Sequence, residues 1–377
     1  MVIAPNAFKG TLTAAAAARA ISAGVTRAWA AAACHSIPLA DGGDGFLETL
    51  LGVPGSSQFL VQVAGPLQET VWANVGLLGK RSEPVAVVEM ASSCGLSLVD
   101  HPSPDTSLQA STRGLGELIV AALGRSVQRV LIGLGGSAST DGGAGLGLAL
   151  GFRFLDRHGE PIRPGGLGLV DLDRIDAPET SALLPEGRLV AACDVDSPLL
   201  GPLGAAATFA PQKGADPPTV RRLEQGLARL AQVVERDLHI SSIDSQPGMG
   251  AAGGAAFGLA VFGRAHLESG ISLVARWVGL DAALDEADLV ITGEGRFDQA
   301  SLRGKVTGEV LQRCQRRHLP CLVLAGSADP SAVRQALELG GRVCLTSDSG
   351  RAPVMPTPQA AFSDLREATT RACWGAD

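Results

Sequence analysis

A run of glycine and hydroxyl residues, Gly133–Gly145, is the part of the sequence best suited to bind a polyphosphate. It contains Gly135, Gly136, Ser137 and Asp141. Consecutive backbone amides without Cβ atoms can surround phosphate oxygens, and the helix expected after Asp141 directs its positive end at them. The alternative is that the glycines only let a helix pack closely on a sheet. The run is not a Walker A loop, because G-x-x-x-x-G-K-[ST] occurs nowhere in the chain.

Two carboxylates and a lysine form a second group. Asp194 and Asp196 follow a predicted strand at residues 189–192, and Lys213 comes soon after them in the sequence. Carboxylates at alternate positions are suited to hold Mg²⁺ beside a phosphate, since this ion prefers oxygen ligands. The alternative is a structural turn that Asp196 caps ahead of Pro198.

A third group combines an acidic residue, an arginine and a lysine. Glu294, Arg296 and Asp298 follow another predicted strand, and Lys305 stands where the next helix is expected to begin. As an acid–glycine–arginine turn, this segment would supply positive charge for a transferring phosphoryl group and a carboxylate for its acceptor. A surface turn held by ion pairs is the alternative.

The first two predicted strands also end in charged residues. Lys9 follows the first strand, and the helix expected after Thr13 would add amide donors for a phosphate. Asp41 ends the second strand, where a carboxylate can bind a hydroxyl or a metal, or take a proton. The alternatives are an ordinary surface lysine and a cap for the following helix.

All these groups lie at the ends of predicted strands. Short β-branched runs alternate with helical patterns, which predicts an α/β protein with largely parallel sheets. Such sheets bind ligands where their strands end. Strands are expected at residues 2–4, 35–39, 85–89, 129–132, 189–192, 289–292, 321–324 and 342–345, and helices after Thr13 and at residues 46–51, 115–123, 144–150, 221–238 and 306–316.

Composition excludes several classes of protein. The chain has 377 residues, of which 46% are hydrophobic and 18% charged, so disorder is excluded. Its 48 glycines are nearly twice the usual share of about 7%. A net charge of -7 argues against a nucleic-acid or anionic-membrane surface, which requires clustered basic residues. The six histidines are dispersed and G-x-S-x-G is missing, which disfavours a zinc site and a serine hydrolase.

The chain is expected to be cytoplasmic. It has no run of 18 strongly apolar residues and no signal-peptide pattern at its start. The seven cysteines are odd in number and form no C-x-x-C pair, which is typical of thiols kept reduced as small buried apolar groups.

Taken in order, the motifs resemble those of the glycerate kinase family of bacterial glycerate 2-kinase type. The recurring segments of that family are similar to P-D-S-F-K, A-D-G-G-E-G, G-G-S-A-T-N-D-G-G, A-C-D-V-x-N-P-L, F-G-P-Q-K-G-A, P-G-x-G-A-A-G-G and G-E-G-R-I-D with G-K shortly after. The matching segments here are Pro5–Gly10, Ala40–Gly45, Gly135–Gly143, Ala192–Leu199, Phe209–Ala215, Pro247–Gly254, and Gly293–Asp298 with Gly304 and Lys305.

Three residues depart from the family pattern. Asn6 stands where the family has an aspartate, so a metal-binding or base role there is in doubt, although an amide can still bind a substrate hydroxyl. Ala210 replaces a glycine, and Ala300 occupies the place of a glutamine.

The resemblance implies two unlike α/β domains, one flavodoxin-like and one restriction-endonuclease-like, with one inserted in the other. We expect a discontinuous domain of residues 1–65 and 285–377. The insert, residues 66–284, would carry the glycine-rich loop. The active site is expected in the cleft between the domains.

The resemblance also implies a phosphotransferase that uses ATP to phosphorylate D-glycerate, and the carboxylates predict assistance by Mg²⁺. The sequence leaves open which hydroxyl is phosphorylated, and the resemblance favours the 2-position, with 2-phosphoglycerate as the product. Either Asp41 or Asp298 would take the proton of the attacking hydroxyl, and the sequence leaves this choice open. On this hypothesis, the expected roles are catalysis by Asp41, Asp298, Arg296 and Lys9; nucleotide binding by Gly135, Gly136, Ser137, Asp141, Lys213 and Lys305; glycerate binding by Asn6, Glu294 and Arg296; and Mg²⁺ binding by Asp194 and Asp196.

Two other functions stay open. The chain could be a kinase for another small hydroxy acid, or a non-catalytic protein that binds a phosphorylated ligand on the same fold. In each case the expected partners are small molecules, with no nucleic acid and no membrane. The oligomeric state is left open.

Overall fold

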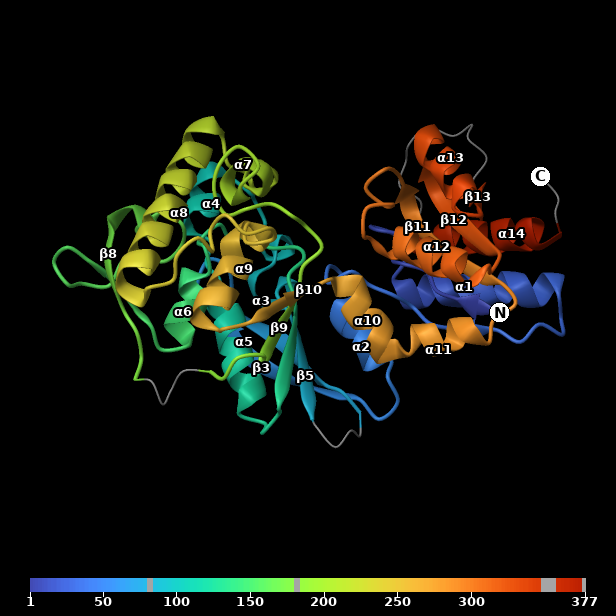
Figure 1. Ribbon diagram of the computed structural model, residues 1–377, viewed down its shortest axis with the longest axis horizontal. Helices are drawn as coiled ribbons and strands as arrows, with labels where there is room; N and C mark the ends of the chain where they lie inside the picture. The colour runs from blue at the N-terminus through green and yellow to red at the C-terminus, as the bar shows by residue number, and fades with distance from the viewer. Residues whose placement is uncertain (80–83, 180–183, 347–356, 375–377) are drawn as a thin grey trace. The chain divides into compact units, whose positions relative to one another are not determined.

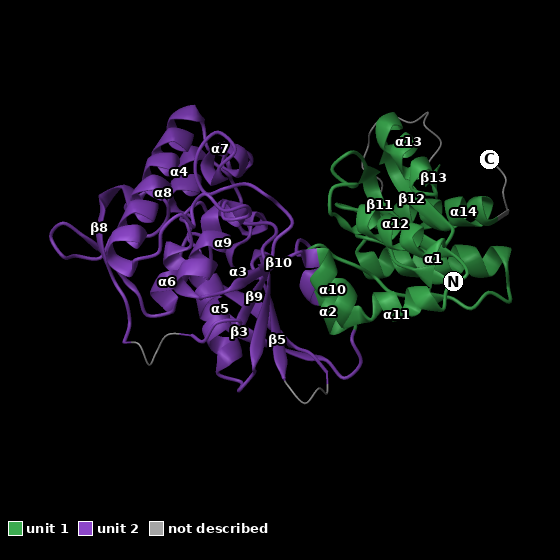
Figure 2. Ribbon diagram, in the orientation of Figure 1, with its two compact units in different colours: residues 1–41, 48–52, 271–377 green, residues 42–47, 53–270 purple. Residues whose placement is uncertain are grey.

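One of the two units of the structure is built from both ends of the chain (Figure 2). The computed structural model describes residues 1–79, 84–179, 184–346 and 357–374. Unit 1 contains residues 1–41, 48–52 and 271–377, and unit 2 contains residues 42–47 and 53–270. The limits expected from the sequence, 1–65 with 285–377 and 66–284, stay a prediction.

Unit 1 contains a parallel sheet with the order β13-β12-β11-β1-β2 (Figure 1). Numbered along the chain, these strands follow the flavodoxin order 2-1-3-4-5, whose direction of winding reverses between β1 and β11. Ligands bind such sheets at this switch point, outside the carboxyl ends of the strands. The strands are β1 (Val2–Ile3), β2 (His35–Ser36), β11 (Val290–Phe297), β12 (Cys321–Ala328) and β13 (Gly341–Leu345).

The first helix of unit 1 forms where a capping residue precedes a stripe of apolar side chains. Thr13 caps α1 by accepting a hydrogen bond from the Ala16 amide at 3.2 Å, and Ile21 and Val25 on this helix are fully buried. The helices are α1 (Ala14–Ala28), α11 (Leu280–Asp285), α12 (Val306–Arg317), α13 (Pro330–Glu338) and α14 (Pro358–Trp374); α2 (Phe46–Leu51) and α10 (Gly270–Val278) begin in unit 2 and continue in unit 1.

Unit 2 contains a mixed sheet with the order β10-β9-β6-β5-β4-β3. Its first four strands are parallel, and β4 and β3 form an antiparallel hairpin at the edge. A separate hairpin joins β7 to β8. The strands are β3 (Ser57–Ala64), β4 (Thr70–Leu77), β5 (Val85–Glu89), β6 (Arg129–Gly133), β7 (Arg153–Asp156), β8 (Leu172–Asp176), β9 (Leu189–Ala192) and β10 (His266–Glu268).

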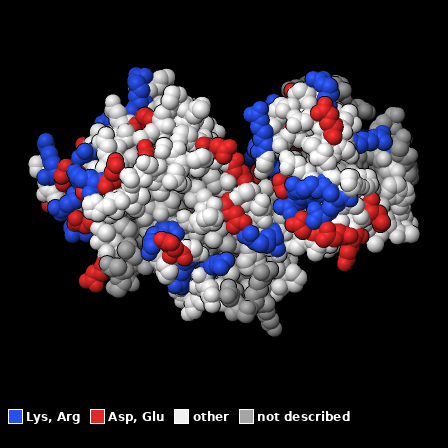
Figure 3. Space-filling model, in the orientation of Figure 1, with Lys and Arg blue, Asp and Glu red and all other residues white. Residues whose placement is uncertain are grey.

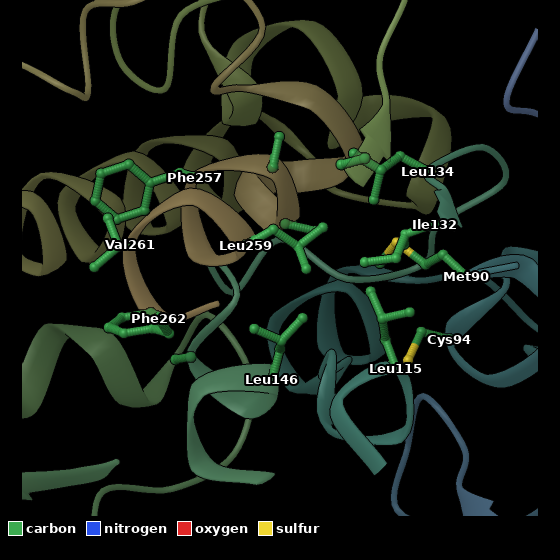
Figure 4. Close-up of a cluster of buried hydrophobic side chains, with 14 of the residues drawn as sticks. Met90, Cys94, Leu115, Ile132, Leu134, Leu146, Phe257, Leu259, Val261 and Phe262 are labelled. Carbon is green, nitrogen blue, oxygen red and sulfur yellow. The ribbon is translucent and has the colours of Figure 1, made fainter. Parts of the chain in front are cut away.

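The core of unit 2 lies between its sheet and its helices (Figure 4). Met90 and Ile132, from the sheet side, and Leu115, Leu146 and Phe262, from the helices, belong to one buried cluster, and all are at most 1% exposed. The helices are α3 (Ala91–Cys94), α4 (Pro104–Gln109), α5 (Arg113–Leu123), α6 (Ala144–Ala149), α7 (Ala205–Phe209), α8 (Pro217–Leu238) and α9 (Ala251–Phe262). This packing fixes the carboxyl ends of β5 and β6.

The α/β fold class and most expected elements are confirmed. Strands β5 and β9 and helix α2 have the predicted limits. The acid–glycine–arginine turn expected after the strand at residues 289–292 is wrong, because β11 continues to Phe297 by pairing with β12 as far as Ala328. The assigned β2 is shorter than expected, yet Ile37 and Leu39 still donate hydrogen bonds to Ile3 and Pro5.

Charged side chains of both signs are intermixed on the face shown in Figure 3. Between α11 and α12, ion pairs join Arg313 and Arg317 to Asp281, and Arg317 to Asp285. Within the described residues, no helix is both long and apolar enough to cross a membrane.

Candidate active site

The glycine-rich loop of unit 2, residues 134–143, begins where β6 ends and contacts a second glycine segment, residues 42–45. Gly135 donates a hydrogen bond to the Gly42 carbonyl at 3.0 Å, and a Cβ atom on Gly135 would lie 2.3 Å from the Gly43 Cα. Only glycine permits this approach of the two backbones. Gly45 in turn donates to Glu89 at the end of β5, at 3.2 Å. Two motifs far apart in the sequence therefore form one surface.

Lys213 enters this loop from the short 3₁₀ helix Pro211–Lys213. Its Nζ donates to Ser137 Oγ at 2.8 Å and to the Ser139 carbonyl at 2.6 Å, and the residue is only 2% exposed. Burial lowers the pKa of Lys213 to about 7, while the charge of Asp141 acts in the opposite direction. The structure thus brings together Lys213 and Ser137, two of the residues predicted to bind the nucleotide.

Asp141 is fully buried, and its carboxylate bonds to other groups of the protein. Its carboxylate accepts hydrogen bonds from the Thr112 amide (2.8 Å), the Thr112 hydroxyl (2.9 Å), and the amides of Gly143 (3.1 Å) and Gly145 (3.2 Å). Burial raises the pKa of Asp141 above its ordinary value, and these hydrogen bonds oppose the rise. We interpret Asp141 as the residue that fixes the shape of the loop, so its predicted contribution to nucleotide binding would be indirect.

A third glycine segment packs against the same loop. Gly253 adopts a left-handed conformation with φ of 70°, and a Cβ atom there would lie 2.0 Å from the Ser139 carbonyl oxygen. Gly142 also donates to the Gly253 carbonyl at 3.2 Å. The glycines therefore do provide close packing, the alternative considered above. The same packing holds the Ser139 carbonyl against Lys213.

The predicted metal ligands lie after β9. Asp194 is half-buried and accepts a hydrogen bond from the Gly270 amide at 2.9 Å, and Asp196 is exposed. No group of three or more His, Cys, Asp or Glu side chains suited to a metal occurs within the described residues. Two carboxylates still fit Mg²⁺, which proteins commonly hold through one or two carboxylates, waters and the phosphates of a substrate.

The remaining predicted residues lie in unit 1, around the carboxyl ends of β1 and β11. The backbone amide of Asn6 donates a hydrogen bond to the Gly293 carbonyl at 2.9 Å, and the side-chain oxygen of Asn6 accepts one from the Ala7 amide at 2.7 Å. Lys9 is exposed and Asp41 is half-buried. Asp41 lies two residues after Leu39, whose backbone amide donates a hydrogen bond to the Pro5 carbonyl. This is the switch point of the flavodoxin-type sheet.

Glu294, Arg296 and Asp298 occupy the same end of β11 and the segment after it. Burial raises the pKa of Glu294 above its ordinary value, and the charge of Lys305 acts against that rise. The side chain of Arg296 is 80% exposed and forms an ion pair with Asp298 at 3.3 Å. Asp298 also accepts hydrogen bonds from the amides of Ala300 and Ser301, at 2.9 and 3.3 Å. These bonds fix the turn before α12.

Several polar residues of these sites are not predicted from the sequence. Thr112 immediately precedes α5, so a helix-start pattern indicates its position but not its bond to Asp141. Glu89 ends a correctly predicted strand, and its partner Gly45 lies 44 residues earlier. Ser301 and Thr307 lie near Glu294 without a recognisable motif.

Parallel α/β architecture, a glycine loop around a buried lysine and charged groups at a switch point define an enzyme that handles phosphorylated small molecules. The model of the glycerate kinase family matches residues 1–372. The chain belongs to this family, and it is a kinase.

Named relatives and a solved structure are similar over most of the chain. A glycerate kinase of Halalkalibacterium halodurans is 42% identical over 87% of this chain and 85% of its own. A glycerate 2-kinase of Escherichia coli K12 is 39% identical over 87% of this chain and 85% of its own. A crystal structure from Salmonella typhimurium LT2, assigned as glycerate kinase 2, matches with a TM-score of 0.81, 36% identity and coverage of 99% and 97% of the two chains.

The contact of Gly253 with Ser139 predicts a large loss of stability in Gly253→Ala. Gly187→Ala is the matched control, because Gly187 has a similar φ of 73° in the same unit but nothing within 4 Å of a Cβ atom. Gly187→Ala should lower the free energy of unfolding by about 1 kcal/mol, from backbone strain alone. Gly253→Ala should lower the free energy of unfolding by about 2 kcal/mol more than the control does, since the added carbon must displace the backbone at Ser139. Equal urea midpoints for the two variants would contradict this account.

The Asp141 network predicts that Thr112→Val destabilises the protein by about 2 kcal/mol. The substitution removes one donor to a buried carboxylate, and it also removes the acceptor of the Leu146 amide, which donates to the Thr112 hydroxyl at 2.9 Å. Thr112→Ser keeps the hydroxyl and should lose less than half as much. Urea unfolding followed by circular dichroism measures both, and a valine variant no less stable than the serine variant would refute the role of the hydroxyl.

Proposed function

We propose that the protein transfers the γ-phosphoryl group of ATP to D-glycerate and forms 2-phosphoglycerate. Membership of the glycerate kinase family carries this proposal, and a named glycerate 2-kinase among the relatives supports the position of transfer. The buried lysine of the glycine loop provides the physical basis, because phosphoryl transfer depends mostly on positioning and on stabilisation of charge.

The phosphates of ATP would bind at the glycine loop of unit 2. Gly136 and Ser137 offer backbone amides and a hydroxyl, whereas the Gly135 amide is bonded to the Gly42 carbonyl. Once protonated, the buried amine of Lys213 would attract phosphate more strongly than an exposed one. Ser139 Oγ and Thr140 Oγ1 are further buried hydroxyl groups of the loop that lack a hydrogen-bond partner within the described residues. Lys9 and Lys305, both exposed, would add positive charge.

Asp194 and Asp196 would hold Mg²⁺, which when bound would neutralise charge on the phosphates. Asp196 is exposed and therefore accessible to such an ion.

Glycerate would bind through residues of unit 1. The exposed guanidinium of Arg296 can pair with the glycerate carboxylate through two parallel hydrogen bonds, a geometry that lysine cannot offer. Asn6 and Glu294 would bind hydroxyl groups. Asp41 or Asp298 would take the proton of the attacking hydroxyl, the choice that the sequence leaves open.

A coupled ADP-release assay tests the activity. We expect turnover with D-glycerate, and little with lactate or tartrate, because the site must hold the carboxylate and the hydroxyl groups of the substrate together. Turnover with another hydroxy acid instead would identify a different kinase. ATP binding without turnover of any hydroxy acid would indicate a binding protein, and phosphorus NMR of the product separates 2- from 3-phosphoglycerate.

The buried lysine predicts that ATP binding takes up a proton. A lysine with a pKa of about 7 is mostly neutral at pH 8, and adjacent phosphates favour its charged form, which raises its pKa on binding. At pH 8 we expect uptake of up to about one proton per ATP. Calorimetric titration in two buffers of different ionisation enthalpy measures this number.

Lys213→Met supplies the control for this measurement, because protons taken up by ATP itself persist in the variant. The wild type should exceed the variant in proton uptake at pH 8, and the excess should shrink toward pH 6, where Lys213 is already charged. Equal uptake at pH 8 would show that Lys213 does not change its charge on binding.

A further inference from the structure

A cavity of about 250 Å³ lies in unit 2, separate from the glycine loop and its lysine. It is bounded by residues around the start of α5, by α6, by β7 and by the segment 161–165. None of the residues 134–143 lines it, and neither does Lys213. An apolar cavity of about 150 Å³ is large enough for benzene, so this one has room for a six-membered ring with a small acidic group.

The apolar part of the lining is already in place. Leu148 on α6 is a large apolar side chain that remains 46% exposed. Phe154 on β7 packs edge-on against Phe262 of the core, with the ring centres 5.3 Å apart. Ile162 donates from its amide to the Phe154 carbonyl at 3.0 Å. An apolar group that enters the cavity would therefore cover apolar surface on a wall that is already formed.

The charged part of the lining is entirely positive. Three arginine side chains line the cavity, and no aspartate or glutamate does. The acidic partners of these arginines lie outside the lining. The pairs are Arg113 Nε with Glu117 Oε1 at 2.8 Å, Arg153 Nη1 with Asp176 Oδ2 at 3.8 Å, and Arg163 Nη2 with Asp171 Oδ2 at 3.2 Å.

These ion pairs leave each guanidinium group able to bind an anion. A guanidinium presents five N–H donors, and each of the three pairs joins its carboxylate through one nitrogen. The arginine side chains are between 48% and 66% exposed. Exposed ion pairs contribute little to stability, so their geometry can adjust to a ligand. A ligand carboxylate can then accept two parallel hydrogen bonds from one guanidinium.

Ser111 and Gly145 form the side of the cavity that adjoins the Asp141 network. Ser111 is 1% exposed, and its hydroxyl accepts a hydrogen bond from the Arg113 amide at 3.3 Å. A Cβ atom on Gly145 would lie 2.2 Å from Ser111 Oγ and 3.1 Å from Asp141 Oδ2. The backbone of Gly145 therefore stands between the cavity and the Asp141 carboxylate.

We propose that this cavity binds a small organic acid with an aromatic or branched apolar body, a ligand other than glycerate or ATP. Its carboxylate would pair with the arginines, and its body would cover Leu148, Phe154 and Ile162. The arginines would repel a cation, and an inorganic anion would leave the apolar lining in water. The proposal does not rest on the proposed function, because the cavity contains none of the residues assigned to ATP, Mg²⁺ or glycerate.

Phenylacetate is the probe, and a ligand-observed NMR titration of the full chain measures its affinity. It joins a six-membered ring to a carboxylate, the two features that the lining recognises. We expect a dissociation constant on the order of 1 mM, as is usual for so small a ligand. Acetate lacks the ring and benzyl alcohol lacks the charge, so each should bind about tenfold more weakly or worse.

Arginine variants locate the bound probe. Arg153→Gln and Arg163→Gln should each weaken phenylacetate binding by about three- to tenfold, because each removes a charged donor from the cavity. Arg264→Gln is the matched control. Arg264 is an exposed arginine of the same unit that pairs with Glu186 outside the cavity, so its loss should leave the affinity unchanged.

Leucine variants test the apolar contact in the same titration. Leu148→Gln should weaken phenylacetate binding by about three- to tenfold, because it places a polar group against the ring. Leu337→Gln is the control, since Leu337 is a helical leucine with 58% exposure on α13 of the other unit. All the substituted side chains are well exposed, so urea midpoints should stay close to that of the wild type.

Three results would overturn the proposal. Acetate that binds as tightly as phenylacetate would show only an anion on surface arginines. Equal affinities in Arg153→Gln, Arg163→Gln and Arg264→Gln would place the probe elsewhere. Loss of phenylacetate binding at saturating ATP or D-glycerate would assign the probe to the substrate sites. Binding that persists there, and that weakens only in the lining variants, supports a separate site, whether or not the protein turns over glycerate.

Discussion

Two buried charges of opposite sign determine the construction of unit 2. Lys213 and Asp141 are both almost wholly removed from water, and a buried charge is tolerated only where hydrogen bonds and an opposite charge compensate it. Asp141 therefore collects four hydrogen bonds from Thr112 and two glycine amides, and Lys213 bonds to Ser137 and the Ser139 carbonyl. Each partner belongs to the glycine loop, to the first turn of α6 or to the N-cap of α5. The loop conformation is thus a condition for burying the two charges.

The glycine content follows from this condition. Amides can converge on Asp141 and carbonyls on Lys213 only if neighbouring backbones come closer than side chains permit. Gly135 meets Gly43, and Gly253 meets Ser139, in contacts that a Cβ atom would block. Segments more than 90 residues apart in sequence therefore meet through their backbones. This accounts for why the glycines cluster at strand ends, and the proposed phosphate binding would use the same arrangement.

Sequence reasoning is most successful where a local pattern suffices. The β-branched runs of β5 and β9 identify those strands to the residue, and the Thr13 cap identifies the start of α1. The turn expected after Thr292 is wrong because pairing with β12, which begins at Cys321, overrides the local preference of glycine for turns. Lys213 and Ser137 are predicted as ligands, but their mutual bond spans 76 residues. Thr307 and Ser301 are missed because serine and threonine are common, and only packing decides which hydroxyl groups come to lie beside Glu294.

The charged groups of the two units differ in a way that suits a kinase. In unit 2, Lys213 is buried, partly neutral and already positioned, so it can stabilise phosphate charge with little rearrangement. In unit 1, Lys9, Arg296 and Lys305 are exposed, and only the carboxyl group of Glu294 is largely removed from water. Arg296, which is proposed to pair with the glycerate carboxylate, is exposed and can adjust to a small flexible acid as it binds, whereas burial raises the pKa of Glu294. The degree of burial of each group therefore corresponds to the step that it would serve.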